Sequence, residues 1–360
     1  DETWHSFQIQ EFRRPEYEVS ARVDAGPHLI GDHATLSVAA SYYAGGGLGG
    51  APVEWEVSAS PTRYVPPNRS DWAFGTWTPW WRMAEPDAAT HTESLAGRTD
   101  PLGQHHLDAR FLAVNPPRPT ELSAEATVTD VNRQAWSART RLLVHPAAHY
   151  VGLKLPRSVV PAGQPVEVEA LVVDIDGAAV PQSAVELVLT RRVWAQVKGQ
   201  WQELDQEPQR CREAQQDGQP LRCRFKPTRG GEYRIEATVR DAQGRANVSE
   251  IRFWVPGAAG RPTREVELEE LVLVPDREAP LPGETVQVLV QAPFASGEGL
   301  MTLSRGGILE QRRFALKDGS ATLRFEVDDA MVPGVRLDVA VVGKAARVDD
   351  AGQPAKGGPP

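Results

Sequence analysis

The feature that most restricts the fold of this chain is a short strand pattern that occurs twice. Glu125-Ala-Thr-Val-Thr-Asp130 recurs as Glu236-Ala-Thr-Val-Arg-Asp241, and a turn and a second alternating segment follow each copy. Alternation of apolar and polar residues is typical of strands with one buried face. A looser repeat consists of a glycine in a turn followed by a predicted strand. It occurs at Gly31, Gly163 and Gly283, and successive copies are 132 and 120 residues apart. The chain therefore contains successive copies of one β-structured unit.

Repeats of about 110–130 residues, each with about seven short strands, indicate tandem β-sandwiches of the immunoglobulin-like kind. We therefore predict an all-β chain of tandem seven-stranded antiparallel β-sandwich domains. The 31 glycines and 30 prolines agree with many short strands joined by turns. No helix-period segment longer than about three turns is evident.

The repeat also predicts domain boundaries. Residues 1–14 would be the end strand of a preceding domain or a leader. The first sandwich would span 15–146, with a long Trp-rich insertion at about 57–105, and the second would span 147–256. A linker at 257–262 would lead into an incomplete sandwich at 263–343. That third domain is expected to have six strands, at about 265–274, 285–292, 299–305, 308–316, 321–327 and 335–343.

The last residues differ in composition from the rest. Residues 344–360 are polar and rich in Gly and Pro, so they cannot bury a core and are predicted to be a flexible tail. Over the whole chain the formal net charge is −9, which argues against a nucleic-acid partner. No apolar run approaches the length of a membrane-spanning helix, although this leaves a lipid anchor on the parent protein open.

Two cysteines, Cys211 and Cys223, have eleven residues between them. Each lies in a segment that could be one arm of a hairpin, with a turn signal at Gln216-Asp-Gly-Gln219. An even count that closes a short loop favours a disulfide in an oxidising compartment, with two free thiols as the alternative. Two sulfurs without a nearby histidine do not predict a zinc site.

The insertion holds a cluster of aromatic residues. Trp72, Trp77, Trp80 and Trp81 lie within ten residues. They could form an exposed contact surface for sugar rings. The interpretation that we favour is structural, because so long a loop needs a small cluster of its own, packed on its own sandwich, to stay ordered.

No constellation of residues predicts catalysis or metal binding. The histidine pairs His105/His106, His28/His33 and His145/His149 lack acidic or cysteine ligands at suitable spacing. Asp174-Ile-Asp-Gly177 resembles the start of a calcium loop, but the expected downstream glutamate is replaced by Val185. It is better interpreted as a hairpin turn. The known motifs of hydrolases, metalloproteases and phosphate-binding loops are missing from the sequence. We therefore expect neither an enzyme nor a cofactor.

Several motifs, in order along the chain, resemble the central part of bacterial alpha-2-macroglobulins. Phe7-Gln-Ile-Gln-Glu-Phe-Arg-Arg-Pro-Glu-Tyr-Glu-Val-Ser-Ala-Arg-Val23 looks like the junction between consecutive macroglobulin domains, where proline separates two alternating strands. Ala40–Trp55 resembles a strand, a Gly-rich turn and a further strand of that family. The segments that are similar to the domain leading into its bait region are Leu281–Val286, Ala292–Phe294, Ser304–Leu309 and Met331–Gly343.

The resemblance implies a structural scaffold of a periplasmic or extracellular protease inhibitor. In that family a protease cuts a flexible bait region, and the cut triggers a conformational change that traps the protease. Its partners would be target proteases and the remaining domains of the parent chain. The tail would begin the bait region and offer Lys344, Arg347 and Lys356 to trypsin-like proteases, or else be a plain linker. The family's Cys-x-Glu-Gln thioester motif is not matched by Cys211-Arg-Glu-Ala214.

A second hypothesis belongs to another functional class. The chain could be an adhesin or a carbohydrate-binding array of immunoglobulin-like modules, with Trp72–Trp81 as its contact surface. The two hypotheses differ in what they predict for the tail, which would be cut first in a protease trap, and for the tryptophans, which would be needed for glycan binding in an adhesin.

Overall fold

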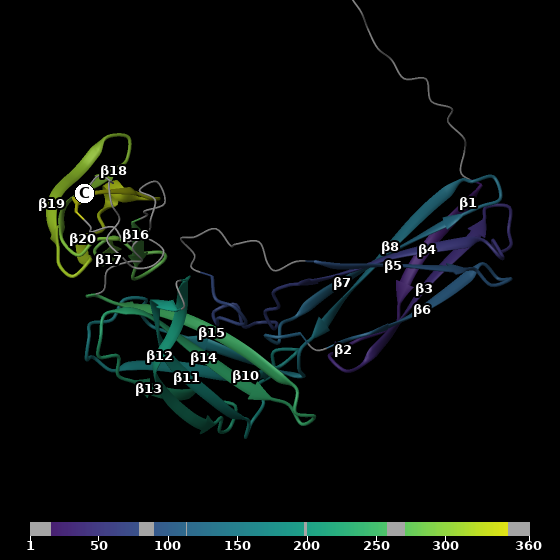
Figure 1. Cartoon of the computed structure of the whole chain (residues 1–360), viewed down its shortest axis with the longest axis horizontal. Coiled ribbons are helices and arrows are strands. Elements are labelled where there is room, and N and C mark those ends of the chain that lie inside the picture. The colour runs from purple at the N-terminus through teal and green to yellow at the C-terminus, as the bar shows by residue number, and fades with distance from the viewer. Residues whose placement is uncertain (1–15, 79–89, 113, 198–199, 258–270, 345–360) are drawn as a thin grey trace, which may run out of the picture. The chain divides into compact units, whose positions relative to one another are not determined.

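A computed structural model describes residues 16–78, 90–112, 114–197, 200–257 and 271–344 (Figure 1). The described part consists of strands joined by turns and loops, with a short 3-10 helix, η2 (Asp329–Met331). The chain divides into two compact units, one of residues 1–63 and 86–147 and one of residues 64–85 and 148–360.

The first unit is a sandwich of two sheets. One sheet contains, in spatial order, β1 (Tyr17–Val23), β3 (His33–Tyr42) and β6 (Gln104–Arg110). The other contains β2 (His28–Leu29), β8 (Ala135–His145), β7 (Thr120–Thr129), β4 (Pro52–Pro61) and β5 (His91–Arg98). Neighbouring strands are antiparallel except for the short parallel pair β2–β8. The first copy of the repeated motif thus begins within β7 of the β7–β8 hairpin.

The alternation in the sequence decides which face of each strand forms the core. In β3, Leu36 and Val38 are fully buried, while the intervening Ser37 is partly exposed. From the opposite sheet, the fully buried Trp55 packs in the same cluster. Each large apolar side chain removed from water in this way stabilises the fold by about 1.5–3 kcal/mol.

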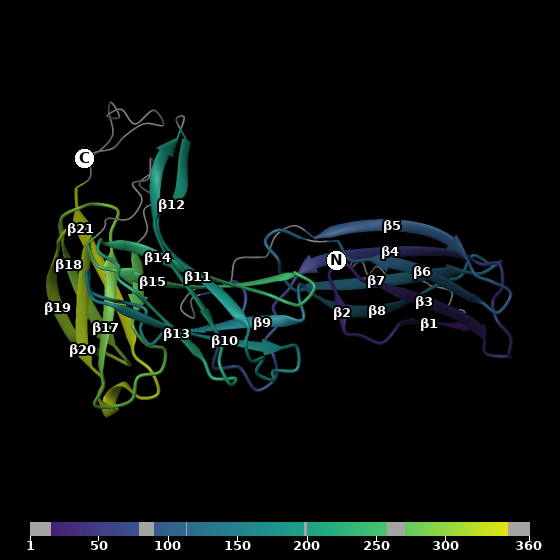
Figure 2. The same ribbon diagram turned by 90° about the horizontal axis from the view of Figure 1, so that it is seen from below.

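The second unit begins with a seven-stranded sandwich, called here the second sandwich. One sheet has the order β13 (Leu221–Phe225), β10 (Val166–Asp174), β9 (His149–Lys154). The other has the order β12 (Gln200–Ala214), β11 (Ala184–Val197), β14 (Gly231–Arg240), β15 (Ala246–Val255). The second copy of the repeated motif lies in the β14–β15 hairpin. Strands β11 and β12 pair as far as Val197 and Gln200, beyond the end of β14, so this hairpin projects from its sheet (Figure 2).

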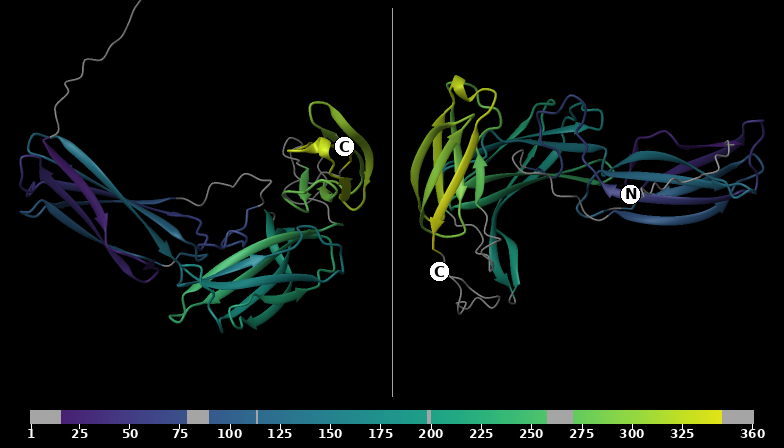
Figure 3. Two further views of the ribbon diagram at one scale, coloured as in Figure 1. Left: turned by 180° about the vertical axis from the view of Figure 1, so that it is seen from behind. Right: turned by 90° about the horizontal axis from the view of Figure 1, so that it is seen from above.

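The remaining six strands form the third sandwich, drawn in green to yellow in Figure 3. Its sheets have the orders β16 (Val272–Pro275), β17 (Thr285–Gln291), β20 (Ser320–Glu326) and β19 (Ile308–Leu316), β18 (Gly297–Ser304), β21 (Arg336–Gly343). Alternate residues of β17 face those of β18, and the buried set includes Val286, Val288, Val290, Met301 and Leu303.

The predicted fold class is confirmed, since the structure is all-β and each part is a two-layered sandwich of mainly antiparallel strands. The six strands expected in the third sandwich are β16–β21. The largest difference is at β16, for which the sequence suggested 265–274, although residues 258–270 lie outside the described part. The Trp-rich connection is shorter than expected, because β4 continues to Pro61 and β5 begins at His91.

Candidate functional site

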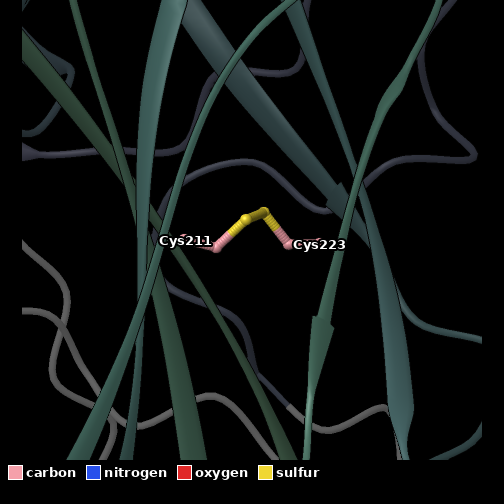
Figure 4. The surroundings of a disulfide bond; sticks show 2 residues. All are labelled: Cys211 and Cys223. Atoms are coloured by element: carbon pink, nitrogen blue, oxygen red, sulfur yellow. A yellow bond between two sulfur atoms is a disulfide. The ribbon is translucent and has the colours of Figure 1, made fainter.

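The cysteines form the expected disulfide, with their Cα atoms 6.1 Å apart (Figure 4). Cys211 lies in β12 and Cys223 in β13, which are edge strands of different sheets of the second sandwich. The expectation that they occupy two arms of one hairpin is therefore wrong, since β12 pairs with β11 and β13 pairs with β10. The bond joins the two sheets at one edge of the sandwich, and its formation removes Cys211 from any thioester chemistry.

Where the structure describes it, the aromatic segment packs on the second sandwich and not on the first, contrary to the sequence-based interpretation. Residues 64–78, called here the strap, belong to the second unit and cover part of the second sandwich. Trp72 is partly buried there, and the Lys154 ammonium lies 5.4 Å from the centre of its ring. Trp77 is also partly buried and lies 6.0 Å, between ring centres, from Trp254. Trp80 and Trp81 lie outside the described residues.

The end of the third sandwich contains the first of the three candidate cleavage residues. Lys344 directly follows β21 and is exposed, whereas Arg347 and Lys356 lie outside the described residues. In its sheet β21 is an edge strand, while its counterpart β14 in the second sandwich has β15 beside it. Among the described residues the third sandwich is thus one strand short of the second, and β21 has one unpaired edge.

Two of the histidines considered as metal ligands, His105 and His28, instead pack against neighbouring aromatic side chains of the first sandwich. His105 accepts a hydrogen bond at Nδ1 from Trp55 Nε1, at 3.1 Å, and burial together with the neighbouring His106 lowers its pKa. His28 packs edge-on against Phe111. Within the described residues no group of three or more His, Cys, Asp or Glu side chains gathers as a metal site would require. The Asp174 carboxylate accepts bonds from the N–H groups of Asp176 and Ala178, as expected for a turn.

The repeated aspartate has the same role in both hairpins. Asp130 Oδ1 accepts the N–H of Gln134 at 2.7 Å, and Asp241 Oδ1 accepts the N–H of Arg245 at 3.0 Å. Asp241 Oδ2 also accepts the Arg245 guanidinium at 2.7 Å and the N–H of Ala148 at 3.0 Å. Burial alone would raise the pKa of Asp241, but these hydrogen bonds and the arginine charge outweigh it and hold the pKa below its usual value.

Comparison with known proteins finds similarity to alpha-2-macroglobulins. Residues 271–353, which include the whole third sandwich, match the family model of the alpha-2-macroglobulin bait region domain. An alpha-2-macroglobulin homolog of Nostoc is 22% identical over 348 residues, which cover 93% of this chain and 18% of the relative. The chain is thus similar to a bacterial alpha-2-macroglobulin homolog over most of its length and to the bait region domain over residues 271–353. The resemblance inferred from the sequence motifs is thereby confirmed.

Two solved structures of alpha-2-macroglobulin from Escherichia coli are also similar to this chain. The native conformation is 17% identical with a TM-score of 0.47, covering 92% of this chain and 23% of the other. The trypsin-activated form is 18% identical with a TM-score of 0.48, covering 91% and 24%. This chain therefore spans about a quarter or less of the length of these relatives. Among its described residues, no helix has the length and apolar character that a membrane crossing needs.

Proposed function

We propose that this chain is part of the scaffold of a broad-spectrum protease inhibitor that traps proteases after they cut its bait region. The observation that carries the proposal is the bait-region match at 271–353, which begins at the third sandwich and continues nine residues past Lys344. The role is structural and inhibitory, without catalytic residues or a cofactor. Its partners are proteases and the other domains of the parent chain.

The physical argument for the cleavage position rests on the backbone. A protease must bind several residues in an extended form, so it cuts chain that is not fixed in a sheet. Residues Arg336–Gly343 pair along their full length with β18, so their peptide groups are protected. Lys344 is the first residue after that ladder. We infer that Lys344, Arg347 and Lys356 are cleavage positions for trypsin-like proteases.

Among the described strands, β21 has no partner at one edge, and this supports the same proposal. The second sandwich places β15 at the equivalent edge, antiparallel to β14. A chain that leaves the third sandwich after Gly343 and returns to that edge would complete the seventh strand. The segment between would then be an insertion within one domain, and cutting it would release a strand that the sandwich needs.

The disulfide supports an oxidising compartment for the parent protein. Such bonds persist where the surroundings are oxidising, and we therefore place the parent protein in the periplasm or outside the cell. The adhesin hypothesis stays a prediction. The described tryptophans Trp72 and Trp77 are engaged with the second sandwich, which does not favour them as a glycan-binding surface.

The test is protease challenge of the full-length parent, with cut positions mapped by mass spectrometry and shape followed by small-angle scattering. A trap predicts that the earliest cuts fall from Gly343 onward and that the scattering profile changes after them. Scattered cuts, or cuts in this segment with an unchanged profile, would overturn the proposal. Glycan binding that Trp77→Ala abolishes would support the adhesin instead.

A further inference from the structure

The outer face of the β9–β10 pair is apolar, although it points away from the sandwich core. Tyr150 and Gly152 of β9 lie opposite Val173 and Leu171 of β10. These side chains do not join the core cluster of the second sandwich and form a separate cluster with Phe74 of the strap. Tyr150, Leu171 and Val173 are at most 3% exposed. The strap therefore covers a patch that would otherwise face water.

Phe74 is the anchor of the strap. It is 7% exposed, and its ring lies directly over Gly152. A Cβ atom added at Gly152 would lie 2.7 Å from Cζ of Phe74 and 3.0 Å from Cβ of Trp72. The Phe74 ring can therefore occupy this position only because residue 152 has no side chain, since ordinary van der Waals contact needs a longer separation.

Backbone hydrogen bonds attach the strap to both sheets. Ala73 and Leu153 exchange two N–H to O bonds of 2.9 Å at the free edge of β9. Two residues later, Gly75 N–H donates to Ser249 Oγ at 2.8 Å, and Glu250 N–H donates to Gly75 O at 2.9 Å, at the free edge of β15. Both β9 and β15 are edge strands, and unpaired edges are normally covered or blocked.

The start of the strap is held independently. The Tyr64 hydroxyl donates to Ile175 O at 2.5 Å, and Arg69 Nε donates to Gly177 O at 2.9 Å. Lys154 and Asp71 form an ion pair of 2.9 Å, but both side chains are largely exposed, so its contribution is small. The strap is thus an ordered part of the second unit from Tyr64 to Trp77.

The strap continues into the joint with the third sandwich. Trp77 packs on a cluster that contains Val159 and Trp254 of the second sandwich together with Val274 and Leu289 of the third. Val274 and Leu289 are paired across β16 and β17 and are fully buried, yet they lie outside the core cluster of their own sandwich. Their outward face is therefore buried in this joint.

We propose that the strap fastens the third sandwich to the second, with Phe74 as its anchor on β9–β10 and Trp77 as its contact in the joint. Release of Phe74 would uncover the patch on β9–β10, remove the strap from the edges of β9 and β15, and withdraw Trp77 from the cluster that contains Val274 and Leu289. The third sandwich is the part that matches the bait region domain. The strap would therefore determine how stably that domain packs on the second sandwich. This inference does not depend on protease trapping.

Single backbone amides can report separately on docking of the strap and on closure of the joint between the second and third sandwiches. The N–H groups of Leu153 and Glu250 bond to the strap, and so their hydrogen exchange measures whether it is docked. The N–H of Gly257 donates to Ser320 Oγ of the third sandwich at 2.9 Å, and its exchange measures whether the joint is closed. Exchange of such amides follows the free energy of local opening.

The experiment compares variants of the full chain by residue-resolved hydrogen exchange. Phe74→Ala should speed exchange at Leu153, Glu250 and Gly257 by about ten-fold or more, while β14 amides keep their protection. Trp77→Ala should speed exchange at Gly257 and leave Leu153 and Glu250 protected. Val65→Ala is the matched control, because Val65 lies in the strap but is 49% exposed, and it should change nothing.

Two outcomes would overturn the proposal. The first is fast exchange at Leu153 and Glu250 in Phe74→Ala with Gly257 unchanged, because the joint would then stay closed after the strap had detached. The second is no change at any of these amides. If Phe74→Ala unfolds the chain, Gly152→Ala tests the same anchor from the sheet side. In this variant the same three amides must respond together.

Discussion

Cys211 and Cys223 connect the two sheets of the second sandwich at the β12/β13 edge, while the strap connects the same sheets at the β9/β15 edge. Both edges of this sandwich are thus closed by a link between its sheets, one covalent and one made of hydrogen bonds and a buried phenylalanine. The two links differ in how they can be opened. The disulfide responds to reductant, whereas the strap responds to any change that displaces Phe74.

The double substitution Cys211→Ser with Cys223→Ser should lower the free energy of unfolding of the second sandwich by about 2–4 kcal/mol, because the bond restricts the unfolded chain. Denaturant unfolding of the two proteins measures the difference. Wild-type protein with reductant should behave like the variant. Equal stability of all three samples would contradict a stabilising role for the bond.

Asp241→Asn should destabilise the second sandwich by about 1–3 kcal/mol, because the amide loses the arginine ion pair and presents a donor where an acceptor is needed. The pKa of Asp241 is lowered in the folded state relative to 3.8. The carboxylate therefore contributes stability above pH 3.8, and this contribution is lost as the pH falls through the lower folded value. Unfolding measured against pH should show this acid loss in the wild type and not in Asp241→Asn. Asp217→Asn, at an exposed turn, is the control.

Tyr17→Phe should destabilise the first sandwich by about 0.5–1.5 kcal/mol, since the hydroxyl is shared between Val128 O at 2.9 Å and Gln134 O at 2.6 Å. Burial and the negative charge of Asp130 raise the pKa of Tyr17 to about 12. Its stabilising effect is complete below pH 10 and is lost as the pH rises toward about 12. Thermal unfolding across that range tests both points. Tyr43→Phe, at a side chain that is 65% exposed, should show neither effect.

The fold could be predicted because its signals are local. Strand alternation and the Asp-containing turns specify each hairpin within about ten residues of sequence, and Asp130 and Asp241 make the same turn bonds in the structure. The disulfide could be predicted from composition, but its crossing between sheets could not. Which strands share a sheet depends on long-range pairing, which the spacing of two cysteines does not encode.

The docking of the strap was missed, although β10 contains a signal for it. Alternation in β10 stops at Ala170-Leu-Val-Val173, where four successive residues are buried. An unbroken apolar run within a strand indicates that both of its faces are covered. The run shows that something packs on the outer face of β10 but not which segment does so. The partner, Phe74, lies about a hundred residues earlier, and only the structure connects the two.

Replacing the three candidate cleavage residues tests the bait assignment directly. In the full-length parent, Lys344→Gln with Arg347→Gln and Lys356→Gln should slow the first trypsin cut by about ten-fold or more, because trypsin cleaves after Lys and Arg and these are the proposed cleavage positions. Arg336→Gln is the matched control: its side chain is 78% exposed, but its backbone lies in β21, so cleavage should not change. A protease that does not require Lys or Arg should still cut the triple variant in this segment. If trypsin makes its first cuts elsewhere in the wild type, residues 344–360 are an ordinary linker and the bait assignment is wrong.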